Sequence, residues 1–480
     1  MLLSPPMRRR LAATAIAIAA LAPAPGATAS PLTDPFLGGV VFTGPTHAHP
    51  TAFYHNPAAL GLDPGTHLYL AGTLRLDQQG IERAPVDDDG APGGGTDPGD
   101  VDNNLLTPGG FTGVYSDFNG GRVTLGIAVY TPYAERFMPD EQPVRYHTLG
   151  GYHYDLTVTP AVTFRVNNKL IVGFGVSVIP YSELKLKFAR DTALEAGSAG
   201  LDADCGGARC GAENPAADQI YDVDVASALN IGFNMGFVIT LKSGWYIGAG
   251  YVSPTSGFGK LFVEANGTVR VTGAERDGGG DYQGRARVTY KLPQTVQAGV
   301  RGPLTEDWEL VATARLHHAG RHEEWDLRMY GGNLEDAGVP EWYPRYRGLR
   351  SVVGLEAGVE APERTNLRLG ARLRFETGGI GEERLAANQI YGLNLGVATG
   401  LEARITEQLA LSLGYAFVFY PGGSATPGSF DPVERVRCVD DGYPIDECQA
   451  TREGRGIPTA AGDYSRLQHA ISLGMRFDWF

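Results

Sequence analysis

The sequence has few cysteines and no excess of basic residues. Its 480 residues include 4 Cys, and 40 Lys and Arg stand against 54 Asp and Glu. Residues 1–29 hold three of the arginines and no acidic residue, so the remainder carries 37 basic and 54 acidic residues, a net charge of −17. Because nucleic-acid binding requires clustered Lys and Arg to neutralise phosphates, no nucleic-acid partner is expected.

Long apolar runs are also lacking. After residue 29, no segment reaches the roughly 18 consecutive apolar residues of a membrane helix. The composition is 43% hydrophobic and 20% charged, which is too apolar for a disordered chain. Length alone suggests two or three soluble domains, but large β-barrels are an exception to that rule.

The N-terminus predicts export. Three arginines at 8–10 precede a short apolar run over 11–21, and a small-residue cleavage site ends at Ala29. This pattern is typical of a secretory signal peptide, here residues 1–29. The alternative is a disordered N-terminus.

The four cysteines form two close pairs in Gly- and Asp-rich segments. In an exported protein two local disulfides are expected, Cys205–Cys210 and Cys438–Cys448. A zinc site is the alternative, but the spacings do not fit a C-x-x-C knuckle and no His lies nearby.

Large apolar side chains alternate with small or polar ones throughout the chain. Over residues 409–420, Leu, Tyr and Phe at odd positions alternate mostly with Ala, Ser and Gly. A period of two predicts strands with one apolar face. The other face is rich in Gly, Ala, Ser and Asn with isolated Arg and Glu, which favours the lumen wall of a barrel over a soluble β-sandwich.

We therefore expect an all-β fold, a transmembrane antiparallel β-barrel over residues 66–480 with about fourteen strands, nearly all of which reach the ~9–11 residues that cross hydrocarbon at a tilt. The expected strands are 66–77, 111–118, 121–131, 153–168, 169–189, 219–241, 243–265, 283–302, 306–330, 349–361, 364–376, 389–405, 407–420 and 464–480.

The connections support this layout. Short turns such as Asn119-Gly120 alternate with long polar loops, two of which carry the cysteine pairs. An even strand number places the short turns and both ends of the barrel in the periplasm and the long loops outside the cell.

A fourteen-strand bore lies between the filled interior of about eight strands and the open channel of sixteen or more. A plugging element is therefore expected, and residues 30–65, ahead of the first strand, form the predicted N-terminal hatch.

The sequence Asn56-Pro57-Ala58 stands directly before the first strand. After a signal peptide and in a fourteen-strand layout, it resembles the signature of the FadL-type family of outer-membrane transporters for long-chain fatty acids and aromatic hydrocarbons. Residues 157–178 are similar to the family's fourth and fifth strands, and 291–308 resemble its eighth and ninth.

The resemblance implies uptake of hydrophobic compounds by passive diffusion. The hatch would block straight passage through the barrel, and the ligand would leave through a gap in the wall. The implied ligand or hatch contacts are Phe53, Tyr54, Asn56, Pro57, Ala58 and Leu60. Proline cannot donate to a strand ladder, so Pro160, Pro180 and Pro293 must lie at bulges, gaps or strand ends. Pro160 and Pro293 are the candidate wall gap; the alternative is that they only bend their strands.

Charged residues of the expected lumen face have two interpretations. Either the arginines of this face bind the carboxylate of a ligand, or they form ion pairs with Glu376 and Glu402 across the lumen. The arginines concerned are Arg368, Arg372, Arg374 and Arg404.

No cofactor and no metal site are expected. His47, His49 and His55 are interpreted as polar hatch residues, although the family often has acidic residues near 47–49. The acidic run at 87–89 lacks the spaced ligands of a calcium loop and is interpreted as solvated.

The expected partners are hydrophobic small molecules, outer-membrane lipid and lipopolysaccharide, and the barrel-assembly machinery. The terminal Phe480 is the expected recognition signal for that machinery. The protein is expected to be a monomer. The apolar face of the last strand is one residue out of frame with Phe480, which predicts a bulge near the end.

Two other functions remain open. An open diffusion porin for small polar solutes requires residues 30–65 to lie outside the lumen. An outer-membrane hydrolase is not indicated, since the sequence has no Gly-x-Ser-x-Gly elbow, although such barrels need not use it.

Overall fold

The computed structural model describes residues 39–86, 97–132, 134–137, 142–192, 213–275, 278–322, 324–347, 349–362, 365–381, 385–425 and 460–479. The signal peptide, the four cysteines, the acidic run at 87–89 and Phe480 lie outside these ranges, so the predictions made for them stay predictions.

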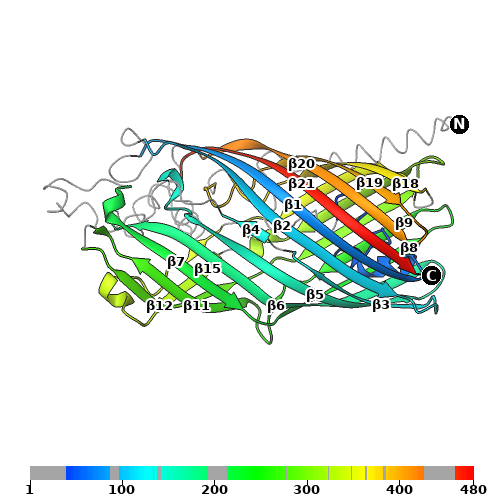
Figure 1. Ribbon diagram of the computed structural model, residues 1–480, viewed down its shortest axis with the longest axis horizontal. Coiled ribbons are helices and arrows are strands. Elements are labelled where there is room, and N and C mark those ends of the chain that lie inside the picture. Colours follow the sequence, from blue (N-terminus) through cyan, green and yellow to red (C-terminus); the bar gives the residue numbers. More distant parts are fainter. Residues whose placement is uncertain are drawn as a thin grey trace.

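The described chain forms one closed antiparallel barrel of fourteen strands, as the alternation predicts (Figure 1). The sheet closes because β1 pairs with β2 on one edge and with β21 on the other. The segments are β1 (Thr66–Arg83), β2 (Asp100–Ser116), β3 (Val123–Tyr130), β4 (Ala134–Arg136), β5 (Gly150–Arg165), β6 (Leu170–Asp191), β7 (Asp218–Ser227), β8 (Asn230–Thr240), β9 (Tyr246–Val252), β10 (Ser256–Gly257), β11 (Val263–Thr272), β12 (Asp281–Tyr290), β13 (Thr295–Pro303), β14 (Glu309–His317), β15 (Glu324–Tyr330), β16 (Arg345–Tyr346), β17 (Val352–Glu360), β18 (Leu367–Glu376), β19 (Asn394–Arg404), β20 (Leu409–Ala425) and β21 (Gly462–Trp479).

Several boundaries differ from the prediction. β1 extends to Arg83, and β2 begins at Asp100 rather than at residue 111. Four strands predicted as continuous are each interrupted midway, and the broken strands are β7/β8, β9/β10/β11, β12/β13 and β14/β15. As a result two ladders stand one above the other on this side of the barrel: β8–β9–β13–β14 and β7–β11–β12–β15.

The outer surface of most of the barrel is apolar, as a lipid-facing wall must be. Large apolar side chains are exposed there, among them Phe174, Met235, Leu373, Leu411 and Leu473. In the described part of the chain, no helix has the length and hydropathy needed to cross a membrane. The short helices are α2 (Ala52–His55), η1 (Pro57–Leu62), η2 (Gln142–Val144), η5 (Pro215–Ala217), η7 (Ala319–Arg321) and η8 (Leu334–Ala337).

A bulge in β6 exchanges the inner and outer faces of that strand. The register of β5 on β6 shifts between Leu156 and Val158, opposite Pro180. Before Pro180, odd positions such as Ile179 point inward; after it, even positions such as Leu184 do so. Because side chains alternate with a period of two, one extra residue moves a whole set of side chains to the other face.

Above this bulge the polarity of the wall is therefore reversed. The inner face carries an apolar cluster that includes Leu184, Leu186, Phe188, Tyr221, Val223, Val225, Val288, Trp325 and Leu327. The outer face carries charged residues such as Lys185 and Asp224, which form an ion pair at 3.0 Å. This part of the barrel stands above the hydrocarbon, on the side of the long loops, and sequence analysis did not foresee it.

The last strand keeps its register to the end of the described chain. β21 pairs with β1 without a shift from Gly462 to Trp479. The bulge predicted near Phe480 is therefore not found among the described residues. The observed irregularity lies instead between Arg466 and Tyr464 of β21, where its partner β20 shifts between Tyr420 and Gly423.

Candidate functional site: the hatch and the lumen above it

Residues 39–65 lie inside the barrel, near the end that carries the short turns and the C-terminus (Figure 1). The segment consists of a loop, the single turn of α2 and the turn of η1. Nearly all of it is buried, from Val40 to Gly61. We call the described part, residues 39–65, the hatch.

Asn56 organises the hatch. Its Oδ1 accepts a hydrogen bond from the backbone N–H of Ala58 at 3.1 Å and so caps η1, where Pro57 occupies the first position. Its Nδ2 donates to the carbonyl of Pro45 at 2.7 Å and to that of Phe237 in β8 at 3.0 Å. One buried amide thus shapes the hatch and fixes it to the wall.

Glycines in the wall make room for this contact. A Cβ placed on Gly236 would come within 2.1 Å of the Asn56 Oδ1, and one on Gly250 within 2.1 Å of the His55 carbonyl. A Cβ on Gly173 would lie 2.2 Å from the Ala58 nitrogen. Since real side chains do not approach so closely, the hatch lies directly on the backbone of β6, β8 and β9.

The predicted apolar hatch residues pack against the wall. Phe53 and Leu60 are fully buried in a cluster with inward aromatic side chains of β1, β2 and β3, including Phe111 and Tyr130. The Tyr54 ring meets that of Tyr130 edge to face at 6.0 Å. Side chains of the wall also bind hatch carbonyls: Asn234 donates to that of Phe53, Thr163 to that of Pro57 and Gln297 to that of His55.

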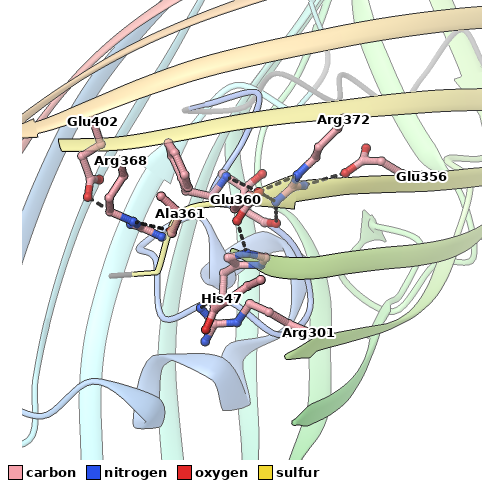
Figure 2. Close-up of polar contacts among 11 residues, drawn as sticks. His47, Arg301, Glu356, Glu360, Ala361, Arg368, Arg372 and Glu402 are labelled. Carbon is pink, nitrogen blue, oxygen red and sulfur yellow. Dashed lines mark hydrogen bonds and ion pairs between the residues drawn. The ribbon is translucent and has the colours of Figure 1, made fainter. Parts of the chain in front are cut away.

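The other side of the hatch is held by charged groups of β17 and β18 (Figure 2). The Glu360 carboxylate accepts from the Phe42 backbone N–H at 2.9 Å and lies 2.8 Å from the Nε2 of His47. Arg372 donates to the Thr43 carbonyl at 2.8 Å and also binds Glu360. β5 and β17 are nearly opposite in the strand order, so the hatch is anchored on both sides of the bore.

The three hatch histidines have separate partners. His47 contacts Glu360, His49 contacts Thr51 at 2.9 Å, and His55 contacts Gln297 at 3.3 Å. Burial lowers the pKa of His47 to about 4 and that of His55 to about 3. The pKa of His49 is also well below its usual value, again because of burial. All three are therefore neutral near pH 7.

The lumen arginines are paired with carboxylates of their own strand or of a neighbouring strand rather than across the lumen. Arg368 of β18 binds Glu402 of β19 at 3.0 Å, and Arg374 binds Glu376 of the same strand. Arg372 does not bind either predicted carboxylate; its partners are Glu356, at 2.5 Å, and Glu360. Arg404 is half-buried at the end of β19.

Sequence analysis missed the wall residues that hold the hatch, Asn234, Gln297 and Glu360. Each is a polar residue at an inward position of a strand. The detectable signal is strongest for Asn234, which lies in the middle of β8 with only apolar and Gly residues within three positions on either side.

Two cavities lie on the extracellular side of the hatch. The first, of about 480 Å³, is bounded by the hatch at Val40, Thr43 and His55. The second, of about 660 Å³, reaches the inward-folded residues around Tyr391. Both are lined by Arg374 and Val418, so they are neighbours, and the first of them reaches the hatch.

The predicted prolines lie at three different kinds of position. Pro180 lies at the bulge of β6, and Pro293 lies in the break between β12 and β13. Pro160 is inside β5, opposite Ile127 of β3, and is exposed on the outer face. Their role in a wall gap stays a prediction.

A further discontinuity lies beside β2. β2 pairs with β3 from Phe111 to Ser116, whereas β2 itself begins at Asp100 and pairs with β1 along its whole length. β3 ends at Tyr130, and β4 resumes on β5 one residue out of register. Among the described residues the regular ladder therefore stops beside β2 at the β3–β4 junction, where Gly110 still exchanges hydrogen bonds with Thr131 and the Arg136 side chain donates to the Leu106 carbonyl at 3.0 Å.

A closed membrane barrel whose bore is filled by its own N-terminal segment defines a class, the plugged outer-membrane channels. The family described as outer membrane protein transport protein (OMPP1/FadL/TodX) matches residues 12–333. The chain belongs to this family, whose members are outer-membrane transporters of hydrophobic compounds rather than enzymes. No curated protein sequence matches it.

Solved structures agree on the fold. A FadL homologue of Pseudomonas aeruginosa is similar with a TM-score of 0.68 and 15% identity, covering 95% of this chain and 100% of that one. The toluene transporter TodX of P. putida gives 0.62 and 12%, covering 94% and 99%. The toluene transporter TbuX of Ralstonia pickettii gives 0.57 and 14%, covering 94% and 99%.

Proposed function

We propose that this protein takes up long-chain fatty acids or aromatic hydrocarbons across the outer membrane by passive diffusion, with a hatch that blocks straight passage and a lateral exit. The observation that carries the proposal is the double anchoring of the hatch, to β5 and β8 through Thr163 and Asn56 and to β17 through Glu360. No catalytic step is part of the proposal.

The physical argument concerns the apolar ligand. Below the two cavities it meets a buried, hydrogen-bonded hatch, and beyond that the aqueous periplasm. Its transfer into lipid is favourable by roughly 25 cal/mol per Å² of apolar surface. An exit through the wall into the bilayer therefore lowers the free energy of the ligand, whereas passage past the hatch requires breaking the hydrogen bonds of the hatch.

We place the exit at the interruption beside β2, in preference to the earlier candidates Pro160 and Pro293. Here β2 reads Pro108-Gly109-Gly110, with little side-chain bulk. A Cβ on Gly109 would lie in ordinary contact, 3.7 Å from the Thr131 Oγ1 and 3.9 Å from the Thr73 Cβ. A side chain larger than Ala at this position would therefore crowd the proposed exit.

The test is uptake of radiolabelled oleate and of toluene into liposomes that contain the purified protein. Gly109→Leu is expected to slow uptake of both compounds several-fold. The control is Gly72→Leu, at the same level of β1, where an added Cβ meets nothing within 4 Å. Unchanged uptake in Gly109→Leu places the exit elsewhere, and Pro160→Ala and Pro293→Ala then test the earlier candidates.

The porin alternative is tested in the same liposomes. It predicts rapid entry of glucose and a large, steady single-channel conductance. The proposed function predicts neither for the wild type. Glucose entry without uptake of oleate or toluene would replace the proposal by a diffusion pore.

The remaining parts of the proposal concern assembly. We propose a monomeric barrel surrounded by outer-membrane lipid and lipopolysaccharide, inserted by the barrel-assembly machinery through Phe480. Deletion of Phe480 is expected to lower the amount of heat-modifiable barrel in the outer membrane, and crosslinking in membranes is expected to give a single-chain species.

A further inference from the structure

The ladder β7–β11–β12–β15 carries a group of arginines on its outer face. β12 and β15 lie in the half of the barrel far from the C-terminus (Figure 1). Arg285 and Arg287 of β12 point outward, because the residues that alternate with them are buried in the inward apolar cluster. Arg328 of β15 points outward for the same reason. We call these three residues the arginine triad.

Strand register brings the members of the triad together. Arg287 is paired directly with Arg328 of the neighbouring strand, and Arg285 lies two residues farther along the same face of β12. Like charges at directly opposed positions destabilise a strand pair. A bound anion would relieve this repulsion, so the geometry of the triad favours an anionic partner.

The triad is only partly neutralised by the protein. Asp326 lies 3.5 Å from Arg328 and also accepts a hydrogen bond from the Trp342 Nε1 at 2.7 Å. Within the described ranges of the chain, the guanidinium groups of Arg285 and Arg287 have no hydrogen-bond or ion-pair partner. Both therefore keep their donors available for a ligand.

Carboxylates on the neighbouring strands bind other cations. Glu264 of β11 forms an ion pair with Lys260 at 2.8 Å. Asp224 of β7 forms one with Lys185 of β6 at 3.0 Å. These local pairs compensate their own charges and leave the triad as an uncompensated cationic site on this part of the outer wall.

The triad also lies at the height of lipid head groups. Below the strand breaks, the outer face of β8 carries Phe233, Met235 and Phe237, which are exposed toward lipid. Arg287 lies three residues above Tyr290, the lower end of β12, which is roughly 10 Å along a strand at ~3.3 Å per residue. The head-group layer on each side of the hydrocarbon is roughly 5–8 Å thick, and the strands are tilted, so the triad falls within that layer.

A short turn at the level of the breaks presents apolar side chains below the triad. Phe258 and Leu261 are 83% and 82% exposed, the highest values among the large apolar side chains of the described chain. The turn leads into β11, whose first residue, Val263, pairs with Tyr290 at the lower end of β12. Such exposure is unfavourable in water and favourable against acyl chains.

We infer that the arginine triad binds a phosphate group of lipopolysaccharide, whose acyl chains lie against Phe258 and Leu261. Lipopolysaccharide carries phosphates directly above its acyl chains, which matches the order of the two features on this wall. The planar guanidinium fork suits phosphate oxygens in bidentate hydrogen bonds. The inference rests on the proposed placement of the barrel, with its long loops outside the cell, and is independent of the compound that the barrel transports.

The test measures lipid binding to the purified protein in detergent, with EDTA present so that no divalent cation bridges lipid and protein. The probes are fluorescent lipid A with its phosphates, dephosphorylated lipid A and phosphatidylglycerol. We expect the wild type to bind phosphorylated lipid A at least tenfold more tightly than either of the other two lipids. Arg285→Gln/Arg287→Gln/Arg328→Gln should lose about tenfold or more in affinity for phosphorylated lipid A and bind dephosphorylated lipid A as the wild type does.

The matched control is Arg122→Gln/Lys169→Gln/Lys242→Gln, which removes the same number of charges from exposed turns at the other end of the barrel. Its affinity for phosphorylated lipid A should equal that of the wild type. Phe258→Ser/Leu261→Ser should weaken binding of both forms of lipid A by a similar factor, because it removes only the acyl contact. Heat-modifiable migration of each variant verifies that the barrel is folded.

Each outcome supports or overturns the site. Equal binding of phosphorylated and dephosphorylated lipid A by the wild type, or unchanged binding after loss of the triad, overturns the phosphate site. Phosphatidylglycerol that binds as tightly as phosphorylated lipid A overturns the assignment to lipopolysaccharide, and an equal loss in the control variant assigns the effect to net charge. Uptake of oleate and toluene into phosphatidylcholine liposomes, which contain no lipopolysaccharide, tests the proposed function separately, so either claim can fail alone.

Discussion

The Nε2 atom of His47 lies 2.8 Å from the Oε2 atom of Glu360, at the point where the hatch meets β17. The two residues are 313 positions apart in the sequence, and both are buried. The contact joins a neutral imidazole to a carboxylate that is itself neutralised by Arg372. It is the part of the hatch attachment that responds most directly to pH.

Acid should loosen the hatch. In the docked hatch the pKa of His47 is lowered from 6.5 to about 4 and that of His55 to about 3, because both are buried. Below pH 6.5 the undocked segment takes up protons that the docked one does not, so docking weakens as the pH falls from about 6.5 toward 4. At pH 5 the effect is about 2 kcal/mol per histidine, since each unit of pKa shift corresponds to ~1.4 kcal/mol.

The measurement is single-channel conductance in planar bilayers between pH 7 and pH 5. Transient openings should become more frequent as the pH falls. Because the pKa of His49 is lowered by burial as well, the variant tested is His47→Gln/His49→Gln/His55→Gln, which should remove most of this pH dependence. A pH response that survives in the triple variant would assign it to other groups.

Gly236→Ala should displace the hatch without unfolding the barrel. The new Cβ would lie 2.1 Å from the Asn56 Oδ1, and the closely packed strand cannot shift outward to relieve this clash. The expected result is a heat-modifiable barrel whose hatch is cut by added protease and whose conductance is raised. Gly72→Ala is the control, because its Cβ meets nothing within 4 Å. A protease-resistant hatch in Gly236→Ala would contradict the close packing described here.

Asn56→Ala should weaken hatch docking by about 3 kcal/mol or more, since it leaves two buried carbonyls and one N–H without a partner. Asn56→Asp provides a graded comparison, because a carboxylate keeps the cap on Ala58 but cannot donate to Pro45 or Phe237. Hydrogen exchange of the hatch amides measures both. Equal protection in Asn56→Ala and the wild type would show that the apolar contacts of Phe53 and Leu60 suffice.

Deletion of Pro180 should prevent assembly. Without the bulge residue, Leu184, Leu186 and Phe188 turn outward and Glu183 and Lys185 turn into the apolar cluster. Pro180→Ala keeps the residue count and should fold. Heat-modifiable migration in outer-membrane fractions distinguishes the two variants. A folded deletion variant would mean that a bulge at another position of the strand compensates for the one-residue shift in register.

Much of the architecture follows from local pattern. Alternation in segments such as 409–420 identifies a lipid-facing strand because a wall between lipid and lumen requires period two. Short turns alternating with long loops give the topology. Asn56-Pro57 ahead of the first strand indicates the start of a short helix, and η1 begins there.

Other features depend on which distant strands pair with one another. The midway breaks of strands such as β7/β8 and the reversal of faces at Pro180 depend on which strands pair, because a bulge is defined by its partner. The partners of His47 and Arg372 lie hundreds of residues away or on neighbouring strands, and alternation alone does not rank one inward carboxylate above another. Local patterns thus predict the barrel and the presence of a plug. Which side chains hold that plug depends on strand register, because only closure of the barrel brings distant inward faces together.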